Sequence, residues 1–309
     1  MTVTLEKTCT IADELAARVT PATLIRRDEP LAKHTTMRIG GPADVYVEPA
    51  SEADLAVILK FCSEREIKFF LLGRGSNLLV RDGGFRGVVI CLAHESFSRI
   101  EIDGERLRCG AGAKLKNVAV EAKRNNLSGV EFLEGIPGSV GGALRMNAGA
   151  MGAVTFGAVE SLRFMDQAGK IYERAAGEVP VEYRTCVLLK NHIALGAVFR
   201  GKTLPRAEIE KRMLAFSEKR WESQPAAPSA GCIFKNPATI PAGKLMDELG
   251  LKGTRVGGAM VSVEHGNFIV NDGRATAQDV LELIEYLKAR AKNERGIDLH
   301  AEVEIIGEA

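Results

Sequence analysis

Residues 134–152 read EGIPGSVGGALRMNAGAMG and place six glycines within nineteen positions. The apolar residues Ile136, Val140, Leu144 and Met146 recur through this stretch, and we expect them to be buried. A buried backbone this rich in glycine has amide N–H groups to satisfy and no side chains that would keep a ligand away. The pattern favours a backbone site for an anionic group such as a phosphate. The alternative is a tight turn followed by a closely packed strand.

A second glycine-containing turn, Gly73-Arg74-Gly75-Ser76-Asn77, follows a predicted strand over residues 68–72. It is not the dinucleotide fingerprint of Rossmann folds, because position 78 is leucine and an extended segment follows in place of a helix. A turn between two strands can still direct amides and the side chains of Ser76 and Asn77 at a pyrophosphate. Together the two turns predict a dinucleotide held between two lobes.

The composition narrows the class of protein. A chain of 309 residues is long enough for two domains, and its net charge of +1 gives no support for a nucleic-acid surface. No apolar run approaches the length of a membrane span, and Glu6, Lys7, Asp13 and Glu14 stand where a signal peptide needs an apolar core. The five histidines are scattered, so no metal site is predicted.

The cysteines are equally scattered and contain no CxxC pair. They are Cys9, Cys62, Cys91, Cys109, Cys186 and Cys232. We interpret them as free thiols in a reducing cytoplasm.

Hydrophobic periodicity predicts an α+β chain. Strands are expected over residues 43–47, 68–72, 78–80, 87–92, 98–102, 106–109, 161–165, 170–174, 192–201, 259–263, 267–270 and 302–306. Helices are expected over residues 11–19, 51–66, 114–126, 205–221, 244–249 and 276–296. Ser51 and Thr276 are predicted to cap their helices, each with an aspartate at the capping-box position. A change of character near residues 201–205 predicts a domain boundary.

Three side chains outside the glycine-rich turns could carry chemistry. Arg184 follows a tyrosine in VEYR and offers a planar, charged fork for a carboxylate or an enolate, although a surface arginine on a turn fits equally well. Cys232 follows a glycine in a loop bounded by prolines, where a small core residue is the more common outcome. Glu302 lies in a predicted strand with Glu304 on the same face, which is typical of a solvated edge.

Taken in order, these segments resemble one family, UDP-N-acetylenolpyruvoylglucosamine reductase, a flavoenzyme that makes UDP-N-acetylmuramate for peptidoglycan. The resemblance runs from about residue 34 to residue 307. The matching stretches are TMRIGGP (36–42), LGRGSN (72–77), GIPGSVGG (135–142), MNAG (146–149), YR (183–184), FKNP (234–237), HGNF (265–268) and EV (302–303).

The resemblance implies a two-lobed FAD-binding domain of the PCMH type over residues 1–201, with lobes of about 1–92 and 93–201. It implies a C-terminal α/β substrate-binding domain over residues 202–309. Non-covalent FAD would lie between the lobes, NADPH would reduce it and leave, and the nucleotide-sugar substrate would then enter the same cleft. The implied reaction reduces UDP-N-acetyl-3-O-(1-carboxyvinyl)-glucosamine.

The resemblance also implies roles for particular residues. Arg184 and Glu302 would stabilise an enolate-like intermediate, and Cys232 would protonate it. FAD would be held by Arg38, Gly73, Arg74, Gly75, Ser76, Asn77, Leu78, Gly138, Ser139, Gly141, Gly142, Asn147, Ala148 and Gly149. The substrate would be held by Tyr183, Arg220, Gln224, Lys235 and Asn236.

This sequence departs from the family in two places. The family commonly has serine as the proton donor, whereas this sequence has Cys232, whose reference pKa of about 8.5 is far below that of an alcohol. The short interval between Arg184 and Arg220 resembles the subclass that lacks an inserted loop bearing a tyrosine, so no such tyrosine is carried over.

Two other functions compete with the reductase. A PCMH-type oxidase of an alcohol or sugar would often tether FAD through a histidine, and neither glycine-rich segment contains one. A non-catalytic protein that binds a nucleotide-sugar is the other alternative. We expect a monomer in the cytoplasm, with no nucleic-acid or membrane partner.

Overall fold

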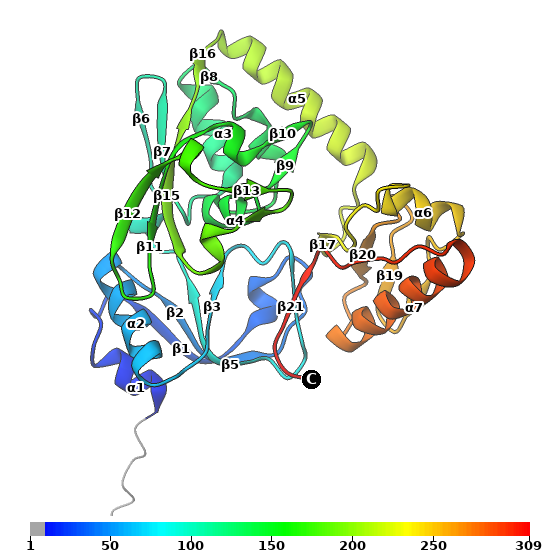
Figure 1. The fold of residues 1–309 in the computed structure, drawn as a ribbon, viewed down its shortest axis with the longest axis horizontal. Helices are drawn as coiled ribbons and strands as arrows, with labels where there is room; N and C mark the ends of the chain where they lie inside the picture. The colour runs from blue at the N-terminus through cyan, green and yellow to red at the C-terminus, as the bar shows by residue number, and fades with distance from the viewer. Residues whose placement is uncertain (1–9) are drawn as a thin grey trace, which may run out of the picture.

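A mixed four-stranded sheet organises the first lobe of the computed structural model, which describes residues 10–309 (Figure 1). The strand order is β1-β2-β5-β3, in which β1 is antiparallel to β2 and β5 runs parallel to both β2 and β3. The elements are α1 (Ile11–Ala16), β1 (Leu24–Pro30), β2 (Pro42–Glu48), α2 (Glu52–Glu64), β3 (Phe69–Leu72) and β5 (Phe85–Cys91).

The predicted cap of α2 is half right. The Ser51 hydroxyl accepts a hydrogen bond from the Asp54 amide at 3.1 Å, as expected. The Asp54 carboxylate does not return to the Ser51 backbone and instead accepts the Thr20 amide at 2.9 Å. The capping box is therefore replaced by a contact that fixes the loop before β1.

An antiparallel five-stranded sheet organises the second lobe, in the order β12-β11-β15-β7-β6. Its strands are β6 (Ile100–Asp103), β7 (Arg106–Gly110), β11 (Val159–Met165), β12 (Ile171–Ala175) and β15 (Ile193–Arg200). The helices are α3 (Leu115–Arg124) and α4 (Val140–Arg145). Short pairs join β8 (Leu127–Ser128) to β16 (Lys202–Thr203), β9 (Gly149–Ala150) to β10 (Ala153–Val154), and β13 (Val181–Glu182) to β14 (Thr185–Cys186).

Short 3-10 helices connect many of these elements. They cover Leu31–His34, Glu95–Phe97, Glu131–Gly135, Thr155–Gly157, Ala176–Glu178 and Leu188–Lys190.

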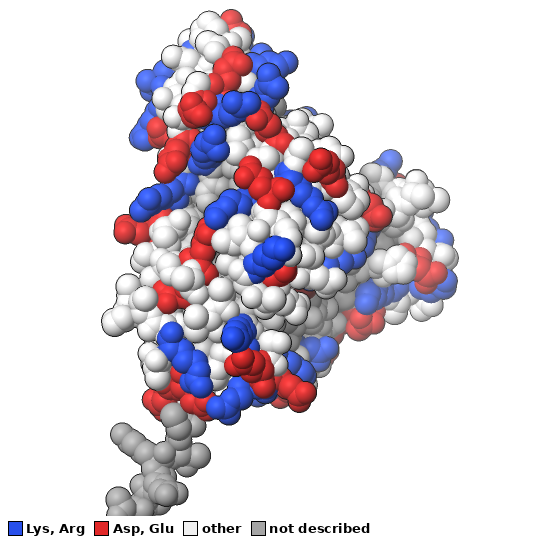
Figure 2. All heavy atoms as spheres, turned by 60° about the vertical axis from the view of Figure 1, so that its left-hand side comes forward, with Lys and Arg blue, Asp and Glu red and all other residues white. Residues whose placement is uncertain are grey.

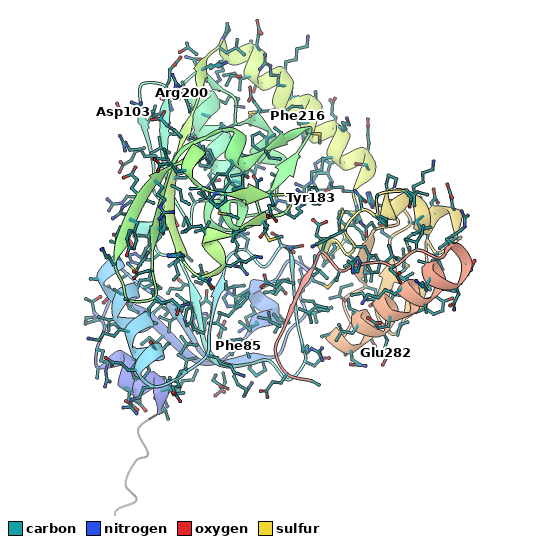
Figure 3. All side chains as sticks on the ribbon, viewed as in Figure 1. Phe85, Asp103, Tyr183, Arg200, Phe216 and Glu282 are labelled. Atoms are coloured by element: carbon teal, nitrogen blue, oxygen red, sulfur yellow. The ribbon has the colours of Figure 1, made fainter. Side chains whose placement is uncertain are left out.

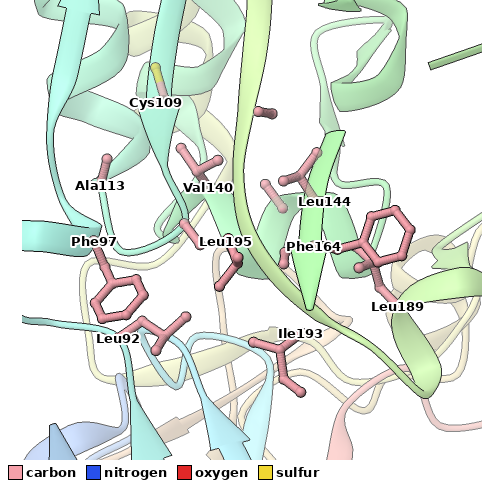
Figure 4. Close-up of a cluster of buried hydrophobic side chains, with 14 of the residues drawn as sticks. Leu92, Phe97, Cys109, Ala113, Val140, Leu144, Phe164, Leu189, Ile193 and Leu195 are labelled. Atoms are coloured by element: carbon pink, nitrogen blue, oxygen red, sulfur yellow. The ribbon is translucent and has the colours of Figure 1, made fainter. Parts of the chain in front are cut away.

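The glycine-rich stretch is helical at its centre. Val140 and Leu144, one helical turn apart, are fully buried in the core shared by the two lobes, next to Leu92 and Leu195 (Figure 4). Ile136 is only partly buried. The strand alternative is therefore wrong, because the apolar spacing that suggested alternation brings residues i and i+4 onto one face of α4.

A third sheet, antiparallel and in the order β17-β20-β19-β18, lies in the C-terminal part of the chain. Its elements are β17 (Ser229–Cys232), α6 (Ala242–Glu248), β18 (Arg255–Val256), β19 (Ala259–Val261), β20 (Phe268–Asn271) and α7 (Ala277–Arg295). The cap of α7 is confirmed, since Thr276 and Asp279 form a complete capping box and Gly296 ends the helix at φ +67°.

This C-terminal core is continuous with the first lobe. Met37, Ile39 and Leu79 of the first lobe pack in the same hydrophobic cluster as Phe234 and Ile284. Their burial in one cluster holds the C-terminal sheet against the turn after β3.

Helix α5 (Arg206–Ser223) crosses from the second lobe toward the C-terminal sheet (Figure 1). Ile209 and Met213 are buried in the core of the second lobe. Arg220 and Trp221, in the last turn of the helix, line cavities near the glycine-rich stretch. The helix therefore positions its C-terminal end at the cleft described below.

The last strand returns to the first lobe. β21 (Glu304–Ile306) runs parallel to β4 (Leu78–Val80), with Glu304 opposite Leu78. The predicted strand over residues 302–306 begins two residues too early, because the paired segment starts at Glu304. The Glu302 carbonyl accepts the Asn77 side-chain amide at 3.2 Å, so the segment before β21 lies against the turn that follows β3.

No helix within residues 10–309 is long and apolar enough to span a membrane. The face drawn in Figure 2 carries acidic and basic side chains interspersed, with neither sign forming a continuous field.

We expect Asp82→Ala to lower the free energy of unfolding by about 1 kcal/mol, the typical cost of removing a helix cap. The Asp82 carboxylate accepts the amides of Ala277 and Gln278 at 2.9 and 3.0 Å, and so caps α7 from the first lobe. Urea unfolding followed by circular dichroism measures the change. Asp103→Ala is the matched control, because the Asp103 side chain is exposed and forms its ion pair, at 3.6 Å, with the likewise exposed Arg108. Equal effects of the two variants would contradict the role of Asp82.

Candidate functional site

The two glycine-rich turns meet across a cleft between the lobes. A Cβ atom at Gly73 would lie 3.2 Å from the Ser139 hydroxyl, and one at Gly138 would lie 4.0 Å from the Ser76 hydroxyl. Gly75 adopts φ +59°, and a Cβ there would lie 2.3 Å from the His34 carbonyl oxygen. Glycine at position 75 is therefore required both by the backbone conformation and by the space.

Residues of these two turns line two adjoining cavities. One, of about 580 Å³, extends from both turns to the side chains of Arg184, Cys232 and Glu302. The other, of about 590 Å³, extends from the same turns toward Tyr46 and His192. They share lining residues that include Thr36, Gly73, Arg74, Ser139, Gly142 and Arg145. The two cavities therefore form one groove between the lobes, long enough for an extended ligand.

The turns offer free backbone donors to this groove. Within residues 10–309, the amide N–H groups of Arg74, Gly75, Ser76, Gly138 and Ser139 donate no hydrogen bond to the protein. Successive unpaired amides around glycines form a concave site for an anion. The residues present therefore fit the pyrophosphate of a dinucleotide such as FAD, which the sequence predicts at this position.

Most of the predicted cofactor residues line the groove. Twelve of these predicted residues line the cavity that reaches Cys232: Arg38, Gly73, Arg74, Gly75, Ser76, Asn77, Leu78, Gly138, Ser139, Gly142, Ala148 and Gly149. Gly141 lines the adjoining cavity. Asn147 lines neither.

Asn147 is buried at φ +39° and holds the backbone around it. Its side-chain oxygen accepts the Phe156 amide at 3.2 Å, and its side-chain amide donates to the Glu182 carbonyl at 3.4 Å. Glu182 ends β13, so these bonds tie the glycine-rich stretch to the hairpin that presents Arg184.

Arg184 occupies the turn between β13 and β14 in a left-handed conformation, φ +59°, which is uncommon for a residue other than glycine. Its Nε donates to the Glu302 carboxylate at 2.8 Å. The side chains are 26% and 12% exposed, so the solvated edge expected for Glu302 is wrong: the return of β21 to the first lobe buries this carboxylate. A Cβ at Gly149 would lie 3.6 Å from an Arg184 nitrogen, which leaves the guanidinium little free space on that side.

Cys232 ends β17 beside this ion pair. A register shift between Ser229 and Cys232 and the positive φ of Gly231 (+76°) mark a bulge in the strand. Burial raises the pKa of the Cys232 thiol to about 11, the negative charge of Glu302 adds to the rise, and Arg184 opposes it. The thiol is therefore protonated at neutral pH.

Of the predicted substrate residues, Arg220 and Gln224 line the cavity that contains Cys232. Arg220 donates to the Gly135 carbonyl, while its Nε is buried without a partner within residues 10–309. Burial also lowers the pKa of Arg220. An unpaired N–H on a partly buried cation is a donor available to an anionic ligand.

The other three predicted substrate residues, Tyr183, Lys235 and Asn236, do not line any of the described cavities. Tyr183 is 64% exposed at the edge of the second lobe, with the Arg184 guanidinium 5.0 Å from its ring centroid (Figure 3). Lys235 and Asn236 are exposed. The Asn236 side-chain oxygen accepts the Ala242 amide at 3.0 Å and so caps α6.

The sequence reasoning missed Arg145, which lines both cavities. Its guanidinium donates to the Glu304 carboxylate at 3.2 Å and to the Leu189 carbonyl at 3.1 Å. The sequence did carry a signal for Arg145, because it is the one basic residue in the glycine-rich stretch 134–152. Trp221 was missed as well, because a tryptophan at the end of a surface helix has no distinctive pattern.

Cys62, Cys91, Cys109, Cys186 and Cys232 are free thiols. Cys9 lies outside the described residues. Across residues 10–309, no three histidine, cysteine, aspartate or glutamate side chains are grouped as metal ligands would be.

Comparison with known proteins gives two family matches. Residues 43–174 match a model described as an FAD binding domain. Residues 224–306 match a model described as the C-terminal domain of UDP-N-acetylenolpyruvoylglucosamine reductase.

Whole-chain relatives agree with these matches. Proteins named UDP-N-acetylenolpyruvoylglucosamine reductase from Clostridium botulinum (strain Eklund 17B) and Bacillus velezensis are 42% and 43% identical to the chain. The alignments cover 93% and 92% of this chain and 94% of each relative. A crystal structure of the reductase of that name from Thermus caldophilus superposes with a TM-score of 0.81 at 39% identity, over 92% of this chain and 99% of that one.

We expect Cys232 to be alkylated slowly by iodoacetamide at pH 7.5 and faster as the pH rises toward about 11, because the thiolate is the nucleophile. Peptide mass spectrometry resolves Cys232 from the other cysteines. Glu302→Gln should shift the reactivity profile to lower pH, since the carboxylate charge contributes to the raised pKa, and Arg184→Ala should shift it to higher pH. A profile unchanged in both variants would contradict this account of the thiol.

Proposed function

Because the chain belongs to the UDP-N-acetylenolpyruvoylglucosamine reductase family, we propose that Arg184, Cys232 and Glu302 carry the reduction of an enolpyruvyl nucleotide-sugar. The chain is an NADPH-dependent flavin oxidoreductase that converts UDP-N-acetyl-3-O-(1-carboxyvinyl)-glucosamine to UDP-N-acetylmuramate in peptidoglycan synthesis. Its relatives over the whole chain are reductases, so the flavin-oxidase alternative is not favoured. The observation that carries the assignment of residues is the Arg184–Glu302 pair beside a buried thiol, in a cavity lined by both glycine-rich turns.

The free amides of residues 74–76 and 138–139 support a site for the FAD pyrophosphate between the lobes, held without a covalent bond. When bound and reduced, FAD supplies the hydride that the vinyl carbon of the substrate accepts. The remaining proposed contributions to the reaction at the substrate come from side chains of this chain.

Arg184 is proposed to stabilise the negative charge that develops on the substrate. Addition of hydride to the vinyl carbon leaves an enolate-like charge toward the carboxylate side. A fixed guanidinium facing that charge lowers the barrier because it is oriented before the reaction. The Glu302 contact at 2.8 Å, the strained turn and the Gly149 backbone restrict where the Arg184 guanidinium can lie.

Glu302 is proposed to act through its pair with Arg184. A bare carboxylate would repel the enolate, whereas a carboxylate hydrogen-bonded to a guanidinium adds no free negative charge to the cavity. Breaking a largely buried ion pair by removing one partner leaves an uncompensated charge. Glu302 therefore positions Arg184, and Arg184 faces the substrate.

Cys232 is proposed to deliver the proton that completes the reduction. The thiol hydrogen moves to the substrate carbon next to the carboxylate, and the thiolate is then reprotonated from water. Its raised pKa of about 11 keeps the proton on sulfur at neutral pH. Burial removes part of the acidity that a thiol would otherwise hold over the serine usual in the family, yet it leaves the thiol a stronger acid than an alcohol.

Arg220 and Gln224 are proposed to hold the nucleotide-sugar, since both line the cavity that contains Cys232. Tyr183, Lys235 and Asn236 remain predicted substrate residues that would have to reach the ligand from positions outside the lining. Asn147 remains a predicted cofactor residue, and its hydrogen bonds support an indirect role through the Arg184 hairpin.

We also propose the division into an FAD-binding unit over residues 1–201, with lobes of about 1–92 and 93–201, and a substrate-binding unit over 202–309. The two family matches fall on either side of this division. The packing of α5 on the second lobe makes residues 224–228 the alternative point of division. A monomer is proposed from the scatter of exposed apolar side chains over several elements, and a cytoplasmic location from the free thiols.

The function is tested by the colour of the purified protein. It should be yellow, bleach with NADPH without oxygen, and regain its colour when the enolpyruvyl substrate is added anaerobically. Recovery of the colour only on admission of oxygen would overturn the reductase assignment. Acid precipitation should leave the flavin in the supernatant.

The proton donor is tested separately. We expect Cys232→Ser to keep most of the activity, and Cys232→Ala to bleach with NADPH at the normal rate but to lose turnover of the substrate. Stopped-flow absorbance of the flavin separates the two half-reactions. Turnover of the alanine variant at the wild-type rate would show that another group supplies the proton.

A further inference from the structure

A basic pocket of about 290 Å³ opens from the reaction cleft at the ends of α3 and α5. Four basic side chains and one acidic side chain line it: Arg74, Lys114, Lys116, Arg220 and Glu134. The whole chain carries a net charge of only +1, so this excess of positive charge is local. Arg74 and Arg220 already have proposed roles in the cleft, whereas Lys114 and Lys116 have none.

The basic groups of this pocket are free to bind a ligand. Within residues 10–309, no side-chain carboxylate lies within ion-pair distance of Arg74, Lys114 or Lys116. Several exposed lysines elsewhere are paired, such as Lys60 and Lys244. The Nε of Arg220 is buried and unpartnered. Four cations that line one concavity without a carboxylate partner among residues 10–309 raise the local concentration of anions.

The pocket is continuous with the cavity that contains Arg184, Cys232 and Glu302. The two share Thr36, Arg74, residues 135–138, Arg220 and Trp221. A ligand whose reacting end lies at Cys232 can therefore extend past Arg220 into the basic pocket. Arg74 and Gly138 line both this pocket and the groove proposed for FAD, whereas Lys116 lines this pocket alone. Lys116 is therefore available to a ligand other than the cofactor.

We propose that this pocket binds phosphate groups of the nucleotides that alternate in the reaction cleft, with Lys114 and Lys116 as their contacts. The proposal rests on the function proposed above, because both the nucleotide-sugar and NADPH carry phosphates at a distance from their reacting ends. Lysine binds a phosphate as a compact point charge, which suits a solvated rim. Trp221, 61% exposed, forms one wall, with the Arg220 guanidinium 5.7 Å from its ring centroid.

Trp221 supplies a direct readout because it is the single tryptophan of the chain. The FAD-loaded protein is titrated with UDP and with adenosine 2′,5′-bisphosphate while tryptophan fluorescence is followed. We expect a saturable change with a dissociation constant that rises with salt, as exposed charge contacts are screened. Trp221→Phe should abolish the signal.

Lys116→Ala is the discriminating variant, since Lys116 lines this pocket and neither of the two cofactor cavities. It should weaken nucleotide binding about tenfold, the scale of one hydrogen bond to a charged group. It should raise KM with little change in kcat. Lys60→Ala, on α2, is the matched control and should bind normally. Uridine, which has no phosphate, should bind the wild type and Lys116→Ala equally.

The outcomes separate the two sources of phosphate. Weaker UDP binding alone identifies the substrate diphosphate, weaker bisphosphate binding alone identifies the 2′-phosphate of NADPH, and loss of both identifies a shared site. Unchanged affinity for both nucleotides in Lys116→Ala and Lys114→Ala would overturn the proposal. Loss of bound FAD with unchanged nucleotide affinity would also overturn it. Failure of NADPH to bleach the wild-type flavin would instead count against the proposed function.

Discussion

The parallel pairing of β21 with β4 is the contact on which the candidate reaction site depends. It joins the last strand of the chain to the strand that follows the glycine-rich turn at residues 73–77, with Glu304 opposite Leu78. Glu302, two residues earlier, is thereby held against the side chain of Asn77 and within hydrogen-bonding distance of Arg184. Three parts of the chain meet only because its end returns to the first lobe. A carboxylate at position 302 would otherwise be an ordinary surface group of the C-terminal unit.

The elements with strong local signals were predictable. The α7 cap, with Thr276 and Asp279, has the expected geometry, and its Gly296 terminator adopts the left-handed conformation. β6 and β7 also pair as a hairpin where the sequence predicts two short strands, over residues 98–102 and 106–109. In these cases the determining interactions lie within a few residues, so the sequence pattern and the structure describe the same contacts.

The sequence-based predictions are wrong where the local structure is determined by a contact with a residue distant in the sequence. Asp54 has the spacing of a capping box, but Thr20 supplies a competing amide. The segment 140–145 has apolar residues that fit alternation as well as a helical turn, and only packing against the core shared by the lobes selects the helix. Glu302 has the pattern of a solvated strand edge, but its carboxylate is largely buried and accepts a hydrogen bond from Arg184, 118 residues away. Periodicity cannot identify such partners, and here the family resemblance supplied the role that the pattern did not.

The pairing of Arg184 with Glu302 also determines what kind of acid Cys232 can be. A cation alone beside the thiol would favour the thiolate, which could not donate a proton. A carboxylate alone would hold the proton on sulfur but repel the charge that the reaction creates. With both groups present, burial is the main cause of the raised pKa of Cys232, so the thiol keeps its proton. The Arg184 guanidinium remains available for its proposed role beside the substrate. We propose that this environment suits a cysteine as the proton donor, because it suppresses the usual reactivity of a thiol.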